Sequence, residues 1–206
     1  MTSSYRTLTG PFEAEVEERK SRFICHVAPI STEDEALELL AATRARHPEA
    51  RHNVWAYLLR DGRERCSDDR EPQKTAGLPT LEVLRRSGLV NLAAVTTRYF
   101  GGTLLGTGGL VRAYTQAVQE ALAGAQGAEY TSCMAVTCHL PYARYEQVLR
   151  LAENAGGKSL GADFGADVAL RVLFKEGDAP AFAAAVRELA RGEELCELGE
   201  AQFCRF

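Results

Sequence analysis

Alternating apolar and polar positions near the start of the chain predict a hairpin followed by a helix. The segment Phe12–Ile30 alternates on both sides of the charged break EERKSR, which is typical of two strands joined by a tight turn. The segment Ser31–Glu35 then has the residue spacing of a capping box, leucines and an alanine supply an apolar face, and Pro48 follows. We therefore expect a helix directly after the hairpin.

The next hundred residues predict two strands and two helices. Val54–Leu59 is rich in aromatic and aliphatic residues and stops at a turn signal, so we expect a strand that enters a hairpin-like loop. Thr80–Arg86 has a short helical pattern, Leu92–Phe100 is a buried strand, and a helix follows a glycine-rich loop. The apolar face predicted for this last helix, from about residue 110 to 125, consists of Leu110, Tyr114, Ala117, Val118, Ala121 and Ala125.

The small-residue stretch Ala123–Glu129 indicates a linker, so we predict two domains, residues 1–128 and 129–206. Beyond the linker, strand and helix patterns follow in the order βαββαβ, which is typical of a ferredoxin-like fold. The predicted class is thus α+β, with a ferredoxin-like C-terminal domain.

Composition is that of an ordinary globular protein, with 46% hydrophobic and 25% charged residues among 206. No stretch approaches the roughly 20 apolar residues needed to cross a bilayer, and the first 20 residues contain no apolar signal core. We therefore expect a cytoplasmic protein without membrane contact. The net charge is −4, yet the window Arg44–Arg112 holds twelve basic and seven acidic residues, a local charge of +5. This window predicts a basic face, although solvated surface arginines would give the same count.

Cysteine and histidine spacing predicts neither a metal site nor a cofactor. The six cysteines include no CxxC pair, and the four histidines form no HExxH motif. In a reducing compartment the thiols would stay reduced and serve in packing.

Five glycines fall within nine residues in the segment Gly101–Gly109, directly before the predicted helix. Glycine permits close backbone approach, and a helix N-terminus offers free N–H groups to an anion, so phosphate binding is one interpretation. The segment matches neither GxxxxGK[ST] nor GxGxxG, which disfavours nucleotide hydrolysis. The other interpretation is that the glycines only allow a tight strand-to-helix turn.

Two polar segments also offer chemistry. Asp68, Asp69 and Glu71 could bind Mg²⁺ or act as acid and base, or they could form turns and pair with nearby arginines. His52 lies beside Asn53 at a strand start, where it is either an acid–base group or a hydrogen-bonded structural residue.

Three motifs in this order, HNVWAY, SDDREPQKTAGLP and RYFGGTLLGTGGLVRAY, closely resemble the family of bacterial YigZ and eukaryotic IMPACT proteins. The resemblance covers roughly Ser21–Leu122 strongly. It implies an N-terminal domain of the ribosomal-protein and elongation factor G domain IV type, followed by a ferredoxin-like domain similar to domain V of that factor. It also implies a role in regulating translation, which in eukaryotic members responds to amino-acid starvation.

The resemblance and the basic window together predict a translation-associated protein, not an enzyme, that binds RNA or a ribosomal component as a monomer. The expected nucleic-acid or anion site comprises Arg51, His52, Asn53, Arg98, Tyr99, Gly101, Gly102, Gly106, Gly108, Gly109 and Arg112. The alternatives are a protein-interaction module without nucleic-acid binding and an enzyme that acts on a phosphorylated small molecule.

Overall fold

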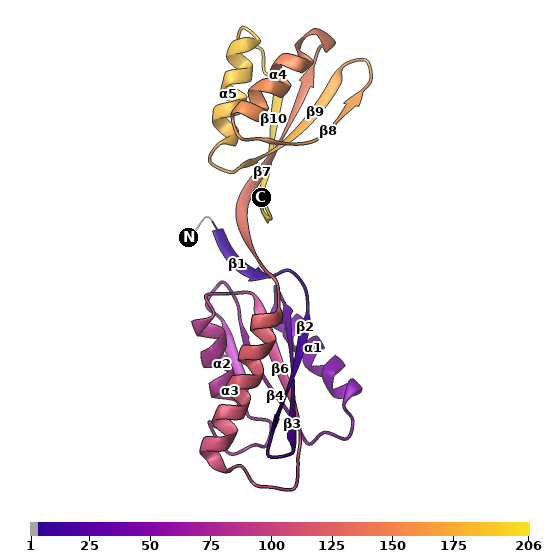
Figure 1. Cartoon of the computed structure of the whole chain (residues 1–206). Coiled ribbons are helices and arrows are strands. Elements are labelled where there is room, and N and C mark those ends of the chain that lie inside the picture. The colour runs from indigo at the N-terminus through magenta and orange to yellow at the C-terminus, as the bar shows by residue number, and fades with distance from the viewer. Residues whose placement is uncertain (1–3) are drawn as a thin grey trace. The chain divides into compact units, whose positions relative to one another are not determined.

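The computed structural model describes residues 4–206, and the chain divides into two compact units (Figure 1). The N-terminal unit is Tyr5–Glu129, and the C-terminal unit is Tyr130–Phe206 together with Ser4. The division lies one residue beyond the boundary predicted after residue 128, inside strand β7 (Gly127–Leu140). Each unit has a separate cluster of buried apolar side chains. Within residues 4–206, none of the helices has the length and apolar character that a membrane crossing needs.

The N-terminal unit is built on one antiparallel sheet. Its strands, in spatial order, are β2 (Phe12–Glu18), β3 (Ser21–Pro29), β6 (Leu92–Tyr99), β4 (His52–Leu58) and β5 (Glu64–Ser67). The predicted hairpin is confirmed as β2 and β3, which pair from Phe12 opposite Val27 to Glu18 opposite Ser21. The short strand β5 was not predicted, and it completes the hairpin that β4 enters.

Helices cover both faces of this sheet. The helix α1 (Glu33–Arg46) packs on one face, and α2 (Gly77–Arg86) and α3 (Gly106–Gly124) pack on the other (Figure 1). The predicted capping box is present, because the Thr32 hydroxyl accepts a hydrogen bond from Glu35 N at 3.2 Å and the Glu35 carboxylate accepts one from Ser31 N.

The apolar face predicted for α3 is confirmed. Five of its six residues, from Leu110 to Ala121, are buried against the sheet, while Ala125 lies just past the helix end. The helix begins at Gly106, about four residues earlier than the periodicity predicts, because the glycines of its first turn carry no side-chain pattern.

The C-terminal unit is ferredoxin-like, as predicted. Its elements after β7 are α4 (Tyr142–Asn154), β8 (Lys158–Phe164), β9 (Val168–Lys175), α5 (Ala179–Leu189) and β10 (Cys196–Cys204). The strand order is β10-β7-β9-β8, and β1 (Ser4–Leu8) also pairs with β7. The segment Ala123–Glu129, which composition suggested as a linker, instead contains the end of α3 and the start of β7. The predicted α+β class is confirmed.

Candidate functional site

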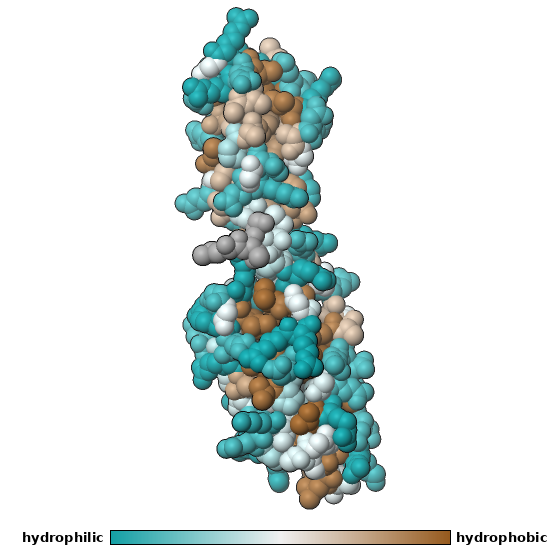
Figure 2. Space-filling view, turned by 90° about the vertical axis from the view of Figure 1, so that its left-hand side faces the viewer, coloured by the Kyte–Doolittle hydropathy of each residue, from teal (hydrophilic) through white to brown (hydrophobic). Residues whose placement is uncertain are grey.

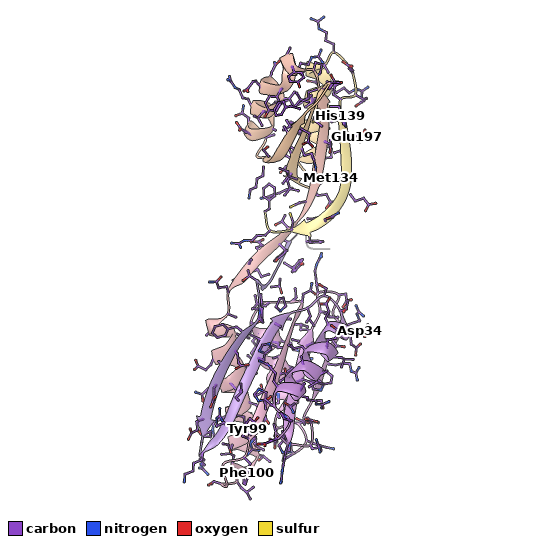
Figure 3. The ribbon with its side chains drawn as sticks, turned by 90° about the vertical axis from the view of Figure 1, so that its right-hand side faces the viewer. Asp34, Tyr99, Phe100, Met134, His139 and Glu197 are labelled. Carbon is purple, nitrogen blue, oxygen red and sulfur yellow. The ribbon has the colours of Figure 1, made fainter. Side chains whose placement is uncertain are left out.

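A cavity of about 740 Å³ opens at the end of the N-terminal unit where β6 stops and β4 starts. Its wall combines Arg51 and His52 at the start of β4 with Arg70 of the loop before α2. The far end of β6 and the glycine segment complete it, and Figure 3 shows Tyr99 and Phe100 together at this end of the unit. Side chains from three separate motifs, among them Arg51, Arg70 and Tyr99, therefore meet around one concave surface.

The glycine segment is fixed to the β2–β3 turn. Gly101 N donates a hydrogen bond to the Ser21 hydroxyl at 3.1 Å, and a Cβ at Gly101 would lie 2.0 Å from the backbone carbon of Lys20. Gly102 and Gly106 have φ of +85° and +69°, which side chains rarely adopt. Gly101, Gly102 and Gly106 are therefore needed for the strand-to-helix turn itself. Anion binding stays an open interpretation for the start of the helix.

The N-terminus of α3 borders this cavity without a side-chain cap. Leu105 occupies the N-cap position and makes no capping hydrogen bond, and the first turn contains no acidic residue. Gly106 and Thr107 line the cavity, and Arg112 extends beside Gly108. Free N–H groups and the helix dipole favour an anion at such a position.

Arg98 is engaged in a buried ion pair beneath the cavity. Its Nη1 donates to Glu71 Oε1 at 2.7 Å, and Tyr114 Oη donates to the same oxygen at 2.8 Å. Arg98 and Glu71 are only 6% and 8% exposed, so each neutralises the other in a site of low dielectric. Burial, followed by the nearby Glu71 carboxylate, raises the pKa of Tyr114 far above its usual value.

This pairing changes what is expected of Arg98. As part of the predicted anion site, Arg98 was expected to contact phosphate with a free guanidinium, but two of its three side-chain nitrogens face protein acceptors. Besides Glu71, Nη2 lies 3.5 Å from the Ser21 hydroxyl, whereas Nε has no hydrogen-bond partner among the described residues. The residue holds the cavity floor, so the exposed arginines of the wall are the ones that remain available to an anion.

The three carboxylates of the polar loop each bind protein donors. Asp68 accepts hydrogen bonds from the backbone N–H groups of Lys74, Ala76 and Gly77, which caps α2. Asp69 accepts from Asn53 N at 2.7 Å and pairs with the exposed Arg44 at 3.1 Å. The carboxylates therefore stabilise turns and pair with arginines, which is the second of the two alternatives given by the sequence. Within residues 4–206, no three His, Cys, Asp or Glu side chains group closely enough to hold a metal.

The same loop presents Arg70 to the cavity through an unusual backbone. Asp69 and Arg70 have φ of +40° and +71°, the left-handed region that non-glycine residues rarely occupy. Strain of this kind clusters at functional sites. Arg70 and Arg51 are exposed, and neither forms an ion pair within the described part of the chain.

His52 and Asn53 differ in accessibility. His52 Nδ1 donates to the Asp69 carbonyl at 2.9 Å, and because a carbonyl only accepts, this bond leaves Nε2 as the nitrogen available to a ligand. Asn53 is buried and its side-chain oxygen accepts from the Thr97 hydroxyl at 2.8 Å. Asn53 therefore supports the sheet and does not line the cavity.

The predicted site divides into two groups. Arg51, His52, Arg98, Tyr99 and Gly106 line the cavity, whereas Asn53, Gly101, Gly102, Gly108, Gly109 and Arg112 lie behind or beside it. Sequence reasoning did not include Arg70, Phe100 and Leu104 in the site. Phe100 and Leu104 are 56% and 82% exposed. The sequence did contain a signal for these two residues. Both are large and apolar and lie in a glycine-rich loop, where a side chain has no core to pack into and is expected at the surface.

The fold and site define a two-domain α+β protein whose N-terminal unit holds an arginine-lined cavity beside an uncapped helix. Two family models match this arrangement, the Impact N-terminal domain over residues 19–122 and a domain of unknown function, DUF1949, over residues 138–193. The chain belongs to the IMPACT family.

Similar proteins agree with this assignment. The chain is 36% identical to the IMPACT family member YigZ of Escherichia coli over 89% of this chain and 92% of that protein. It is 47% identical to the IMPACT family member YvyE of Bacillus subtilis over 59% of this chain, a match that spans 57% of that protein. A crystal structure described as a hypothetical protein is 32% identical, with a TM-score of 0.66 over 98% of this chain and 99% of the other.

Proposed function

We propose that this protein acts in translation by binding single-stranded RNA at the N-terminal cavity. The observation that carries the proposal is the meeting of exposed arginines, an uncapped helix N-terminus and an exposed aromatic ring around one concave surface. Membership of the IMPACT family supports a translation-related role.

The phosphate part of the argument rests on Arg51, Arg70 and the start of α3. Both guanidiniums are exposed on the cavity wall, and each can make paired hydrogen bonds to phosphate oxygens. The N–H groups of Gly106 and Thr107 supply further donors. Glu49 also lines the cavity, so charge alone does not select the ligand, and the geometry of the donors matters.

The base part of the argument rests on Phe100. Its ring is 56% exposed and has Arg98 on one side, with the guanidinium carbon 5.7 Å from the ring centroid. An exposed ring next to phosphate donors is the combination that single-strand binding proteins use to stack bases. Base stacking accepts any sequence, so we expect affinity without strong sequence preference.

Fluorescence anisotropy with a labelled single-stranded RNA, at several salt concentrations, tests the proposal. The double variant Arg51→Ala/Arg70→Ala is expected to bind more weakly and to flatten the salt slope by roughly 0.7 for each phosphate that the protein no longer neutralises. The matched control Arg63→Ala/Arg86→Ala removes two exposed arginines outside this cavity and should bind like the unaltered protein. An equal loss of RNA affinity in both double variants would mean that only net charge matters and would contradict a site at the cavity. Absence of RNA binding at low salt would refute the proposal.

A second candidate function is docking of a protein segment on the α2–α3 face. A groove of about 530 Å³ lies between these helices, with Leu78 and Val111 each 37% exposed. Figure 2 looks onto this side and shows apolar residues between hydrophilic ones. Binding there would depend less steeply on salt than RNA binding, because few counterions are released.

The remaining alternative is an enzyme that acts on a phosphorylated compound bound in the N-terminal cavity. Measured turnover of such a compound would favour this enzyme over an RNA-binding protein.

A further inference from the structure

Two cysteines of the C-terminal unit meet across neighbouring strands. Cys138 of β7 and Cys196 of β10 are register partners, and their Sγ atoms lie 2.7 Å apart. Their chain neighbours His139 and Glu197 lie close together on these two strands in Figure 3. The cysteines are 58 residues apart along the chain, which is why spacing motifs such as CxxC did not find them.

The strand geometry already suits a covalent bond between these sulfurs. His139 N donates to the Leu195 carbonyl at 2.8 Å, so the adjacent partners Cys138 and Cys196 form a pair without backbone hydrogen bonds between them. In such pairs the Cα atoms are about 4.5 Å apart and the side chains approach closely. Disulfides span Cα distances from about 4.4 to 6.8 Å, so the strands need not move.

We propose that Cys138 and Cys196 are a reversible disulfide site that bonds the last strand to the middle of the C-terminal sheet. The co-reactant is a low-molecular-weight disulfide such as oxidised glutathione. The thiolate of Cys196 attacks one sulfur of this compound and releases one small thiolate. Cys138 then loses its proton and attacks the Cys196 sulfur, which releases the second. The small disulfide takes up the two electrons, and two protein thiols become one disulfide.

The environments of the two sulfurs assign these roles. Cys196 is partly exposed, and the hydrogen bond from Cys138 lowers its pKa, so it ionises first and meets the oxidant. Cys138 is fully buried, and its contact with Cys196 together with burial raises its pKa. A buried thiol next to the mixed disulfide is protected from solvent and well placed to complete the exchange.

The other cysteines provide an internal comparison. Cys25 is buried in the core of the N-terminal unit, where burial raises its pKa to about 12. Cys133 and Cys204 lie on the same two strands as the proposed pair but are diagonal, since Cys133 is opposite Gln202. The Cys133 thiol donates to the Thr131 carbonyl at 3.3 Å, and burial and Cys204 raise its pKa to about 12. Neither Cys25 nor the diagonal pair Cys133 and Cys204 is as well placed for disulfide formation as Cys138 and Cys196.

Titration of the full-length protein with oxidised and reduced glutathione, followed by mass spectrometry of an unreduced digest, tests the site. We expect one crosslink, between the peptides that contain Cys138 and Cys196, to form and to disappear with reductant. The disulfide should also raise the unfolding midpoint of the C-terminal unit by roughly 10 °C, because it closes a long loop.

Two single variants make the assignment specific. Cys196→Ser should abolish the crosslink, and the matched Cys204→Ser, also partly buried on β10, should leave it intact. Cys196 is only partly buried, so we expect the Cys196→Ser variant to fold, and circular dichroism verifies this. A crosslink between Cys133 and Cys204, a stable mixed disulfide without a crosslink, or all six thiols remaining free would each overturn the proposal.

Discussion

Among single residues, Glu71 has the largest predicted influence on the candidate site because its one oxygen serves two buried partners. Replacing it with alanine leaves the Arg98 guanidinium buried without an opposite charge. We expect Glu71→Ala to lower the free energy of unfolding by about 3–5 kcal/mol. Chemical denaturation, followed by the fluorescence of Trp55 in the same unit, measures this change.

The variant Tyr114→Phe is the control for that prediction. It removes one hydrogen bond to Glu71 but keeps the Arg98 pair and the ring packing against Phe23. The expected loss is about 1 kcal/mol. If Glu71→Ala cost no more than Tyr114→Phe, Arg98 would have to find another partner or reach solvent, and the pair would not be holding the cavity floor.

Two glycines of the same segment are expected to respond in opposite ways to alanine. A Cβ at Gly101 would collide with the Lys20 backbone at 2.0 Å, whereas a Cβ at Gly108 would meet only Arg112 Nη1, at 3.7 Å. Gly101→Ala should therefore destabilise the unit by about 1–3 kcal/mol. Gly108→Ala lies in a helix and should be neutral or stabilise it by up to about 1 kcal/mol. Thermal unfolding of both variants measures these changes in stability. Equal changes would contradict the close approach of Gly101 to the Lys20 backbone.

At the scale of elements, α2 depends on a carboxylate from outside the helix. Asp68 accepts hydrogen bonds from Ala76 N and Gly77 N at the start of the helix and from Lys74 N in the preceding loop, and Ala76, at the N-cap position, has no side-chain acceptor. Asp68→Ala should lower the free energy of unfolding by about 2 kcal/mol. Asp61→Ala, at an exposed turn, should change it far less. A similar cost for both variants would show that α2 does not need this cap.

The elements themselves were largely predictable because their patterns are local. Periodicity predicted the hairpin, α1, the buried face of α3 and the βαββαβ order, since each depends on residues close in the chain. The short strand β5 and the early start of α3 were missed. In both, pairing or packing with distant segments fixes the structure where side chains give little pattern.

The candidate site was predictable in its location but not in its partnerships. The charge of the window Arg44–Arg112 predicted a basic face, yet nothing local reveals that Arg98 binds Glu71, 27 residues away, or that Cys138 faces Cys196. An arginine count also treats buried and exposed side chains alike. Only the folded chain separates the paired Arg98 from the exposed Arg51 and Arg70.

For the whole molecule, two separate cores predict two unfolding events. Phe174 is fully buried in the C-terminal core and stacks on Phe182 with ring centroids 4.6 Å apart. Phe174→Ala should cost the C-terminal unit about 3–5 kcal/mol. Trp55, the single tryptophan, lies in the N-terminal unit, so its emission should report an unchanged midpoint while circular dichroism shows an early transition. Coincident shifts by both probes would mean that the units unfold together.

The left-handed backbone at Arg70 carries a consequence for the evolution of this protein. Glycine would adopt φ of +71° without strain and would stabilise the loop by about 1 kcal/mol. Selection for heat resistance alone would therefore favour Arg70→Gly, and the same change would remove one of the two exposed cations of the cavity. Under the proposed RNA-binding function, arginine at this position exchanges stability of the loop for affinity toward phosphate.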